Sequence, residues 1–300
     1  MSGSTPVSDP ASSATGPEVS IVVPTFNRRD LLQRQIGAIR RQSSSVRWEL
    51  VVVDNGSTDG TAAWVQALVD QDSRIRYVSA TDESGAAYAR NVGAHAARAP
   101  LLAFADDDDV VGEGWLEALM IALEDHDLVA CRMDYDLLNR PEIARFWPRT
   151  QETALGRDDD GRPVCNAAIG IRRSTWLALG GQRSGILVGE DVDLSQRAAR
   201  EMSTSATFAP AAVYHRQLPA TVAECLRDGI RSGRSRVRSA APRRGPTAAM
   251  SDRHSSLGSL AWLVGRLPYV FGSRRYMWAR RCGQVIGAWR ESWRRRPGGA

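Results

Sequence analysis

Short β-branched runs alternate with segments of helical periodicity through the first third of the chain. We therefore predict an α/β fold, because such alternation implies parallel strands joined by right-handed crossovers, with helices on both faces of one sheet. A further helix at 115–124 and a strand at 128–133 would extend a mostly parallel sheet. The strand-like runs cover residues 19–24, 49–53, 74–79 and 101–105, and the helical segments cover 28–42, 61–69 and 84–97.

Four consecutive carboxylates, Asp106 to Asp109, follow directly on the strand-like run at 101–105. Adjacent carboxylates repel one another, so they are costly to hold together without a cation or several hydrogen-bond donors. Open α/β sheets bind their ligands at the carboxyl ends of their strands. Two interpretations of this run remain open: a divalent metal site that holds a phosphorylated substrate, or a solvated acidic turn.

A second acidic cluster, formed by Glu190, Asp191 and Asp193, follows a glycine at the predicted start of a helix. Helix N-termini favour negative charge, so these residues could simply stabilise the helix. Alternatively, a positioned carboxylate there could remove a proton from an attacking hydroxyl group. His215 ends a short strand-like run further along the chain and could be a metal ligand or a structural residue.

Positive charge is concentrated at the C-terminal end. Residues 1–226 hold 22 Arg against 31 acidic residues, a net charge of −9, whereas residues 227–300 hold 17 Arg against 3, a net charge of +14. The last helical segment places several arginines around an apolar stripe, a pattern typical of a basic amphipathic helix. The stripe consists of Trp278, Cys282, Val285, Trp289 and Trp293.

Three interpretations of this basic tail remain open. Residues 253–300 could contact an anionic membrane surface, with tryptophan at the interface and arginine on the phosphate head groups. They could instead dock on the acidic body of the same chain or on a second copy in a homodimer. Nucleic acid is the least favoured partner, although arginine and aromatic side chains can bind it.

The remaining composition indicates a reducing, intracellular setting. The four cysteines have no paired metal-ligand or redox spacing. Residues 1–18 are rich in Ser, Thr, Pro and Ala, which is typical of a disordered leader and not of a signal peptide. Because no run approaches the roughly 20 apolar residues that span a bilayer, we expect a cytoplasmic protein, with peripheral contact at the inner face of the membrane as an option.

Four motifs, taken in order, closely resemble the nucleotide-sugar half of family 2 glycosyltransferases. The resemblance is strong over residues 18–115 and weaker over 165–215. It implies a GT-A fold, in which one Rossmann-like α/β domain binds a nucleotide-activated sugar and a divalent cation. The motifs are VSIVVPTFNR at 19–28, VVVDNGSTDGT at 51–61, ARNVG at 89–93 and FADDDD at 104–109.

The resemblance also implies a division of the chain. Residues 1–18 would be a leader, and residues 19–218 the glycosyltransferase domain. Within it, 19–115 would form the nucleotide-sugar half and 116–218 the acceptor half. Residues 219–300 would form a basic helical extension.

Position by position, the resemblance assigns the donor and metal sites. Asp106 and Asp108 match the family's Asp-x-Asp motif, whose first acid meets ribose or metal and whose second holds the metal. Asp107 fills the variable place, although a shift of one residue would make Asp107 and Asp109 the pair. Such ligands suit Mn²⁺ or Mg²⁺, and His215 would complete the metal site. The implied nucleotide-sugar-binding residues are Pro24, Thr25, Asn27, Arg28, Asp54 (on the base), Arg90 (on the base or the phosphates), Asp106 and Asp107.

The implied reaction is a single in-line displacement that inverts the anomeric centre. Asp191 would be the general base, and Glu190 and Asp193 would orient the acceptor or the base. The chain would thus be a hexosyltransferase that uses a nucleoside diphosphate sugar, for which uridine diphosphate is the family's commonest carrier. The acceptor would be a saccharide, a lipid-linked sugar or a small molecule.

Two alternatives from other functional classes remain. A sugar-phosphate nucleotidyltransferase can use a similar sheet and acidic metal site, but it would normally need a Gly-rich phosphate loop after the first strand, where this chain has Pro24-Thr25-Phe26-Asn27. A non-catalytic membrane- or nucleic-acid-binding protein could retain a degenerate GT-A fold, but the intact acidic residues argue against it.

Overall fold

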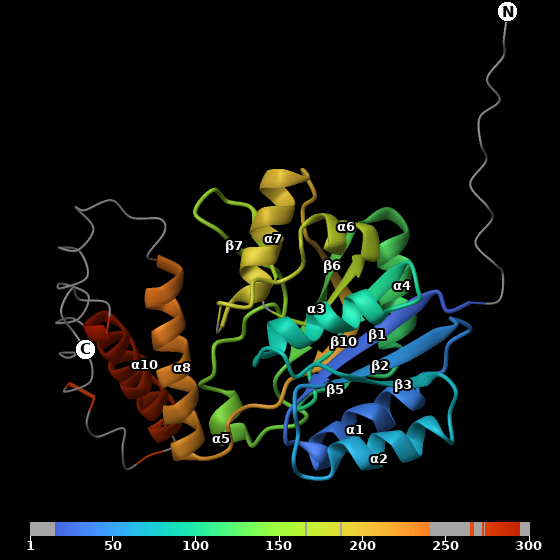
Figure 1. Cartoon of the computed structure of the whole chain (residues 1–300). Helices are drawn as coiled ribbons and strands as arrows, with labels where there is room; N and C mark the ends of the chain where they lie inside the picture. The colour runs from blue at the N-terminus through green and yellow to red at the C-terminus, as the bar shows by residue number, and fades with distance from the viewer. Residues whose placement is uncertain are drawn as a thin grey trace, which may run out of the picture.

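One mixed eight-stranded sheet forms the centre of the protein, in the spatial order β3-β2-β1-β4-β9-β6-β10-β5 (Figure 1). The computed structural model describes residues 16–165, 167–186, 188–240, 265–266, 272 and 274–294. Residues 1–15 of the predicted leader lie outside the described residues. The strands are β1 (Val19–Thr25), β2 (Trp48–Asp54), β3 (Ile75–Ser79), β4 (Leu101–Phe104), β5 (Val110–Val111), β6 (Leu128–Asp134), β9 (Ile169–Arg172) and β10 (Thr207–His215).

The first four strands pair in parallel, as the alternation of strands and helices predicts. β1 lies between β2 and β4, and β3 pairs with the outer side of β2. Thr25 at the end of β1 is in register with Asp54 at the end of β2, and the acidic run begins just past β4. Parallel pairing therefore brings the polar ends of three strands to one edge of the sheet.

The second half of the sheet departs from this simple pattern. β9 runs antiparallel to both β4 and β6, whereas β10 is parallel to β6 and β5 is antiparallel to β10. The carboxyl end of β10 consequently meets the residues that follow the acidic run, since His215 pairs with Val110.

Helices cover both faces of the sheet, as predicted. Side chains alternate between faces along each strand, so Ile21 and Val23 pack toward α1, α2 and α4, whereas Val22 packs toward α3, α6 and α7. The helices are α1 (Arg29–Arg40), α2 (Thr61–Val69), α3 (Ala86–Ala96), α4 (Trp115–Asp125), α6 (Arg173–Ala178) and α7 (Glu190–Glu201).

The stretch 134–163 is mostly irregular, as the sequence predicts, but it contains three short elements. They are the helix α5 (Pro141–Ala144) and the antiparallel strands β7 (Gly156–Arg157) and β8 (Pro163–Val164). Ile143 of α5 joins an apolar cluster with Met133 and Tyr135 on the body of the protein.

Two long helices of the basic region, α8 (Val222–Ala240) and α10 (Arg275–Arg294), lie side by side next to the sheet (Figure 1). They approach closely because glycines face the partner backbone: Gly229 and Gly233 on α8, and Gly283 and Gly287 on α10. Cys225, Tyr276 and Ala279 extend the apolar cluster at α5 and dock the pair on the body.

The tryptophan stripe of α10 is not the side that packs on α8. The buried positions of α10 include Gly283 and Gly287, whereas Trp289 and Trp293 are 64% and 54% exposed. Close backbone contact needs small residues, so the helix turns its glycines inward and its bulky residues away from α8. Within the part of the chain that the structure describes, no helix is long and apolar enough to cross a bilayer.

Gly283→Ala is expected to destabilise the protein, because a Cβ at this position would overlap the carbonyl oxygen of Leu226. Overpacking of this kind typically costs about 1–3 kcal/mol. Urea unfolding followed by circular dichroism measures the free energy of unfolding.

Gly37→Ala in α1 is the matched control. The nearest atom to its new Cβ would be the end of the flexible Arg41 side chain at 3.2 Å. This variant should be neutral or more stable by up to about 1 kcal/mol, because alanine favours helix over glycine. Equal stability of the two variants would contradict the proposed close packing of α8 on α10.

Candidate active site

A cleft of about 440 Å³ lies at the carboxyl edge of the parallel strands. The loop after β1, the start of α3 and the acidic run contribute to its lining, and so do the loop before α7, the residue after β10 and helix α8. Nine of the predicted site residues line this cleft: Pro24, Thr25, Arg28, Arg90, Asp106, Asp107, Asp108, Glu190 and Asp191.

The acidic run is held in place by hydrogen bonds to its backbone. The buried side chain of Gln35 donates to the carbonyl of Asp106 at 3.1 Å and accepts from the amide of Val111 at 3.0 Å, so it spans the whole run. The hydroxyl of Tyr214 on β10 accepts a bond from the Asp106 amide at 2.6 Å. These bonds hold the backbone of the turn in place and do not involve the four carboxylate groups.

Three of the four carboxylates converge. Asp106, Asp108 and Asp109 each offer an oxygen within 4.8 Å of the other two. Burial and the negative charge of Asp108 raise the pKa of Asp109 well above its ordinary value. A divalent cation would relieve this concentration of charge, and three oxygen ligands are the donors that Mn²⁺ or Mg²⁺ prefers. The residues therefore fit such an ion, with Asp109 as an added candidate ligand.

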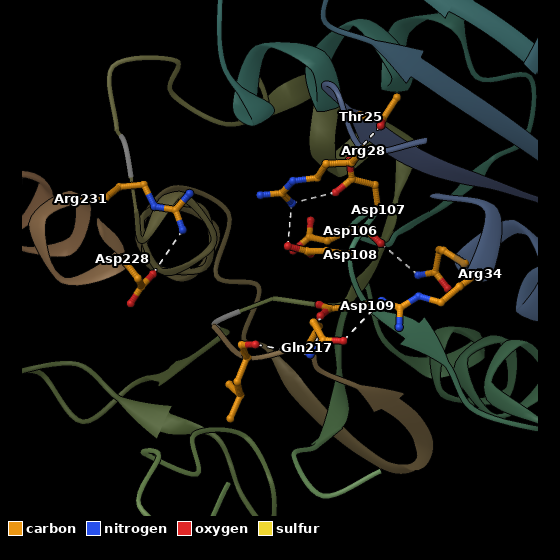
Figure 2. A network of polar contacts seen from close by, with 12 residues as sticks. Thr25, Arg28, Arg34, Asp106, Asp107, Asp108, Asp109, Gln217, Asp228 and Arg231 are labelled. Atoms are coloured by element: carbon orange, nitrogen blue, oxygen red, sulfur yellow. Dashed lines mark hydrogen bonds and ion pairs between the residues drawn. The ribbon is translucent and has the colours of Figure 1, made fainter. Parts of the chain in front are cut away.

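Asp107 points away from this group. Its direction helps to decide whether Asp106 and Asp108 or Asp107 and Asp109 form the metal-binding pair. Its carboxylate accepts a bond from the Thr25 hydroxyl at 2.8 Å and one from Arg28 at 3.0 Å, and Arg28 also contacts Asp108 at 2.6 Å (Figure 2). Burial raises the pKa of Asp107 to about 6. The structure thus brings together Asp106 and Asp108, and it does not bring together the alternative pair of Asp107 and Asp109.

Arg90 on α3 links the two acidic clusters. Its guanidinium donates to Asp106 at 2.5 Å, to Glu190 at 3.0 Å and to Gln182 at 3.1 Å. Burial alone would lower the pKa of Arg90, but the surrounding carboxylates outweigh it and raise the pKa well above its ordinary value. In this structure the predicted base- or phosphate-binding arginine therefore bonds to protein carboxylates at the floor of the cleft.

Asp191 occupies a buried position at the start of α7. The side chain of Gln182 donates a hydrogen bond to the Asp191 carboxylate at 2.5 Å, and the backbone amide of Gln182 donates one to the side chain of Asn91 at 2.9 Å. Burial raises the pKa of Asp191 to about 7. A carboxylate with such a pKa can accept a proton near neutral pH, which is what general-base catalysis requires. Asp193 instead pairs with Arg183 and Arg197.

Asp54 and Asn27 do not line the cleft. Asp54 is buried and accepts bonds from the Ser57 amide at 2.8 Å and the Tyr77 hydroxyl at 3.0 Å. Asn27 joins the first two loops, since its side chain accepts a bond from the Thr58 amide at 2.7 Å. Base recognition by Asp54 stays a prediction, and it would require this buried side chain to become accessible from the cleft.

His215 does not join the acidic group. Its Nδ1 lies 2.8 Å from a carboxylate oxygen of Asp134, and it is absent from the group of converging ligand atoms among the described residues. Its role as a metal ligand therefore stays a prediction and would require a different side-chain orientation.

Two cleft arginines were missed by sequence reasoning. Arg216 follows His215 at the end of β10; burial would lower its pKa, but Asp109 and Asp106 raise it. Its place directly after the strand-like run that ends at His215 was its one sequence signal. Arg231 extends from α8 toward the acidic run (Figure 2). Its position depends on how α8 docks, which no local pattern indicates.

Arg90→Met should lower the free energy of unfolding at pH 7 by more than the roughly 1 kcal/mol of an exposed pair and by up to about 3–5 kcal/mol, because it leaves the partly buried carboxylates of Asp106 and Glu190 without their cation. Arg90 helps to lower the pKa of Asp106 against the effect of burial. The stabilisation is therefore present above the ordinary carboxyl pKa of about 4 and is lost as the pH falls below it. Urea unfolding at pH 7 and at a pH well below 4 measures both effects.

The matched control is Arg183→Met, which removes an ion pair to Asp193 from a side chain that is 62% exposed. An exposed pair contributes about 1 kcal/mol or less. If both variants lose the same stability at pH 7, Arg90 does not hold the two clusters together.

Solved structures confirm the predicted fold. The mannosyltransferase PcManGT from Pyrobaculum calidifontis, determined in complex with GDP-Man and Mn²⁺, aligns with a TM-score of 0.66 at 21% identity. The alignment covers 94% of this chain and 89% of that protein. At this level of identity the likeness concerns the GT-A fold alone.

Sequence relatives match part of the chain. The validoxylamine A glucosyltransferase of Streptomyces hygroscopicus subsp. jinggangensis is 40% identical over 115 residues, which are 38% of this chain and 27% of that protein. The UDP-Glc:alpha-D-GlcNAc-diphosphoundecaprenol beta-1,3-glucosyltransferase WfgD of Escherichia coli is 30% identical over 125 residues, which are 42% of this chain and 48% of that protein. The chain thus spans less than half the length of these curated relatives. The sequence profile described as Glycosyl transferase family 2 matches residues 20–176, more than half of the chain, and the chain belongs to this family.

Proposed function

We propose that this protein is a metal-dependent, inverting glycosyltransferase that moves a sugar from a nucleoside diphosphate to a hydroxyl acceptor. One observation carries the proposal: the converging carboxylates Asp106, Asp108 and Asp109 and the buried Asp191 belong to one site, with Arg90 between them. The arrangement offers a cation site and a base, the two functions that such a displacement needs.

Asp106 and Asp108 would hold Mn²⁺ or Mg²⁺, with Asp109 as a third ligand. A bound cation would neutralise the charge that develops on the leaving diphosphate. Arg28, Arg216 and Arg231 add positive charge around the same cleft. Pro24 and Thr25 would border the nucleotide, because they line the cleft at the end of β1.

Asp191 would accept the proton of the attacking acceptor hydroxyl. Its pKa of about 7 leaves a substantial fraction ionised at neutral pH, while burial makes the carboxylate a stronger base than an exposed one. The neighbouring Glu190 would itself be held in place by Arg90, which donates a hydrogen bond to it at 3.0 Å. A single displacement assisted by one base inverts the anomeric configuration.

Relatives suggest the classes of donor and acceptor. The names of the bacterial relatives include a UDP-glucose donor and undecaprenol-linked acceptors, whereas another relative acts on validoxylamine A. We therefore propose a UDP-sugar donor and a saccharide, lipid-linked or small-molecule acceptor. Residues 19–218 would form the catalytic domain and 219–300 a basic extension.

The outer side of α10 fits an anionic membrane surface. Trp289 and Trp293 are exposed, and their rings lie 5.9 Å apart. Arg290 and Arg294 on the same helix are also exposed. Tryptophan favours the interface and arginine the lipid phosphates, so this surface would bring the cleft to a lipid-linked acceptor.

Two carboxylate variants should separate binding from chemistry. Asp108→Asn is expected to abolish the Mn²⁺-dependent rise in melting temperature with a nucleoside diphosphate, because it removes a cation ligand. Asp191→Asn should keep that shift but lower turnover of a nucleotide sugar by about 10²–10⁴-fold. A thermal-shift screen of nucleotides and their sugars, followed by a turnover assay with the donor it identifies, measures both.

The control for this pair is Asp70→Asn, which changes an exposed carboxylate outside the cleft.

In the wild type, turnover should rise with pH and level off above about 7, because Asp191 must lose its proton to act as a base. Unchanged turnover in Asp191→Asn would exclude Asp191 as the base, and an unchanged metal-dependent shift in Asp108→Asn would exclude Asp108 as a ligand.

The double variant Trp289→Ser and Trp293→Ser should weaken binding to vesicles that contain anionic phospholipid by about tenfold or more, because two exposed aromatic rings are lost. Co-sedimentation measures this binding. Ile121→Ser changes another exposed apolar side chain, on α4, and should leave it unchanged. Equal binding of the wild type to anionic and neutral vesicles would count against the membrane contact.

A further inference from the structure

Helix α8 carries none of the predicted catalytic motifs, yet one of its faces reaches the active site. Arg231 lines the cleft, and Ser235, about one turn further on, is 2% exposed. The hydroxyl of Ser235 donates a hydrogen bond to the carbonyl of Val188 at 2.7 Å and accepts one from the amide of Val188 at 3.0 Å. The Ser235 side chain thus hydrogen-bonds both the amide and the carbonyl of Val188, which lies two residues before Glu190.

The backbone position of Val188 determines where α7, with Glu190 and Asp191 in its first turn, begins. Gly189 follows with a φ of +93°, a left-handed turn, and α7 starts at Glu190. The Val188 side chain is 39% exposed on the cleft, so its own burial holds it only in part. The two bonds from Ser235 therefore fix the backbone three residues before Asp191.

The helix pair that carries Ser235 is closely packed. Gly233 on α8 lies against the backbone of Gln284 on α10, and Gly229 lies against that of Arg280. Asp228 on α8 also accepts a bond from Arg280 at 2.8 Å. Ser235 therefore belongs to a closely packed helix pair that gives the Val188 loop a point of attachment outside the sheet.

We propose that Ser235 is a positioning residue for sugar transfer: its hydroxyl anchors Val188 and thereby orients Asp191 toward the acceptor hydroxyl. This inference rests on the proposed function. A base must lie within hydrogen-bond reach of the proton that it removes, and a misplacement of about 1 Å can lower the rate roughly 10²-fold. The C-terminal helices therefore belong to the catalytic machinery in addition to any role in membrane contact.

The test compares Ser235→Ala with Ser232→Ala in the full-length protein. Ser232 is three residues earlier on α8, and its replacement leaves both Val188 bonds in place. In Ser235→Ala we expect kcat for hydrolysis of the donor sugar nucleotide to fall at least about tenfold, whereas the Kd for uridine diphosphate with Mn²⁺ stays within about twofold. Ser232→Ala should match the wild type in both.

Hydrogen–deuterium exchange gives a readout that does not depend on activity. Amides at 188–192 should exchange faster in Ser235→Ala, because the amide of Val188 has lost its acceptor, while exchange in α10 stays unchanged. Unchanged exchange at 188–192, or a kcat equal to that of the wild type, would overturn the proposal.

Faster exchange throughout α8 and α10, with kcat and donor Kd affected alike, would also overturn the proposal, because it would show a purely structural role. Wild-type protein that turns over no sugar nucleotide would refute the proposed function instead. Faster exchange confined to 188–192 would in that case still support the Ser235 contact.

Discussion

The ion pairs of Arg90 are the interaction on which the active site depends. Asp106 and Glu190 are 84 residues apart in sequence, yet both bond to the same buried guanidinium, at 2.5 and 3.0 Å. Burying a carboxylate without a counter-charge costs several kcal/mol, and Arg90 on α3 provides a positive charge between the acids of α7 and the end of β4. A metal ion would add further positive charge beside Arg90, Arg28 and Arg216.

Much of the N-terminal half could be predicted because its information is local. Strand and helix periods fix the layers, and parallel pairing then places Thr25, Asp54 and the acidic run at one edge. The direction in which individual side chains point was harder to predict from the sequence. Asp54 turns to Tyr77 on the neighbouring strand, and Asp107 turns to Thr25, because these partners come from other strands that the sequence does not place in three dimensions.

The features missed by sequence reasoning all depend on long-range packing. The antiparallel β9 and the docking of β10 beside β5 decide that Arg216 lines the cleft, whereas His215 pairs with Asp134. Arg231 and Ser235 belong to a helix whose sequence indicates only an arginine-rich amphipathic segment. Their contribution becomes visible once the glycine contacts with α10 fix which side of α8 meets the body.

Those glycine contacts would also let one C-terminal region serve both proposed purposes. Because the small residues of α10 face α8, its tryptophans and several arginines are left on other sides of the helix. On α8, by contrast, Ser235 is buried and bonded to Val188 on the body of the protein. A membrane could therefore engage Trp289 and Trp293 without competing for the face that anchors the loop before Asp191. The proposed attachment to lipid and the proposed positioning of the base are thus compatible in one helix pair.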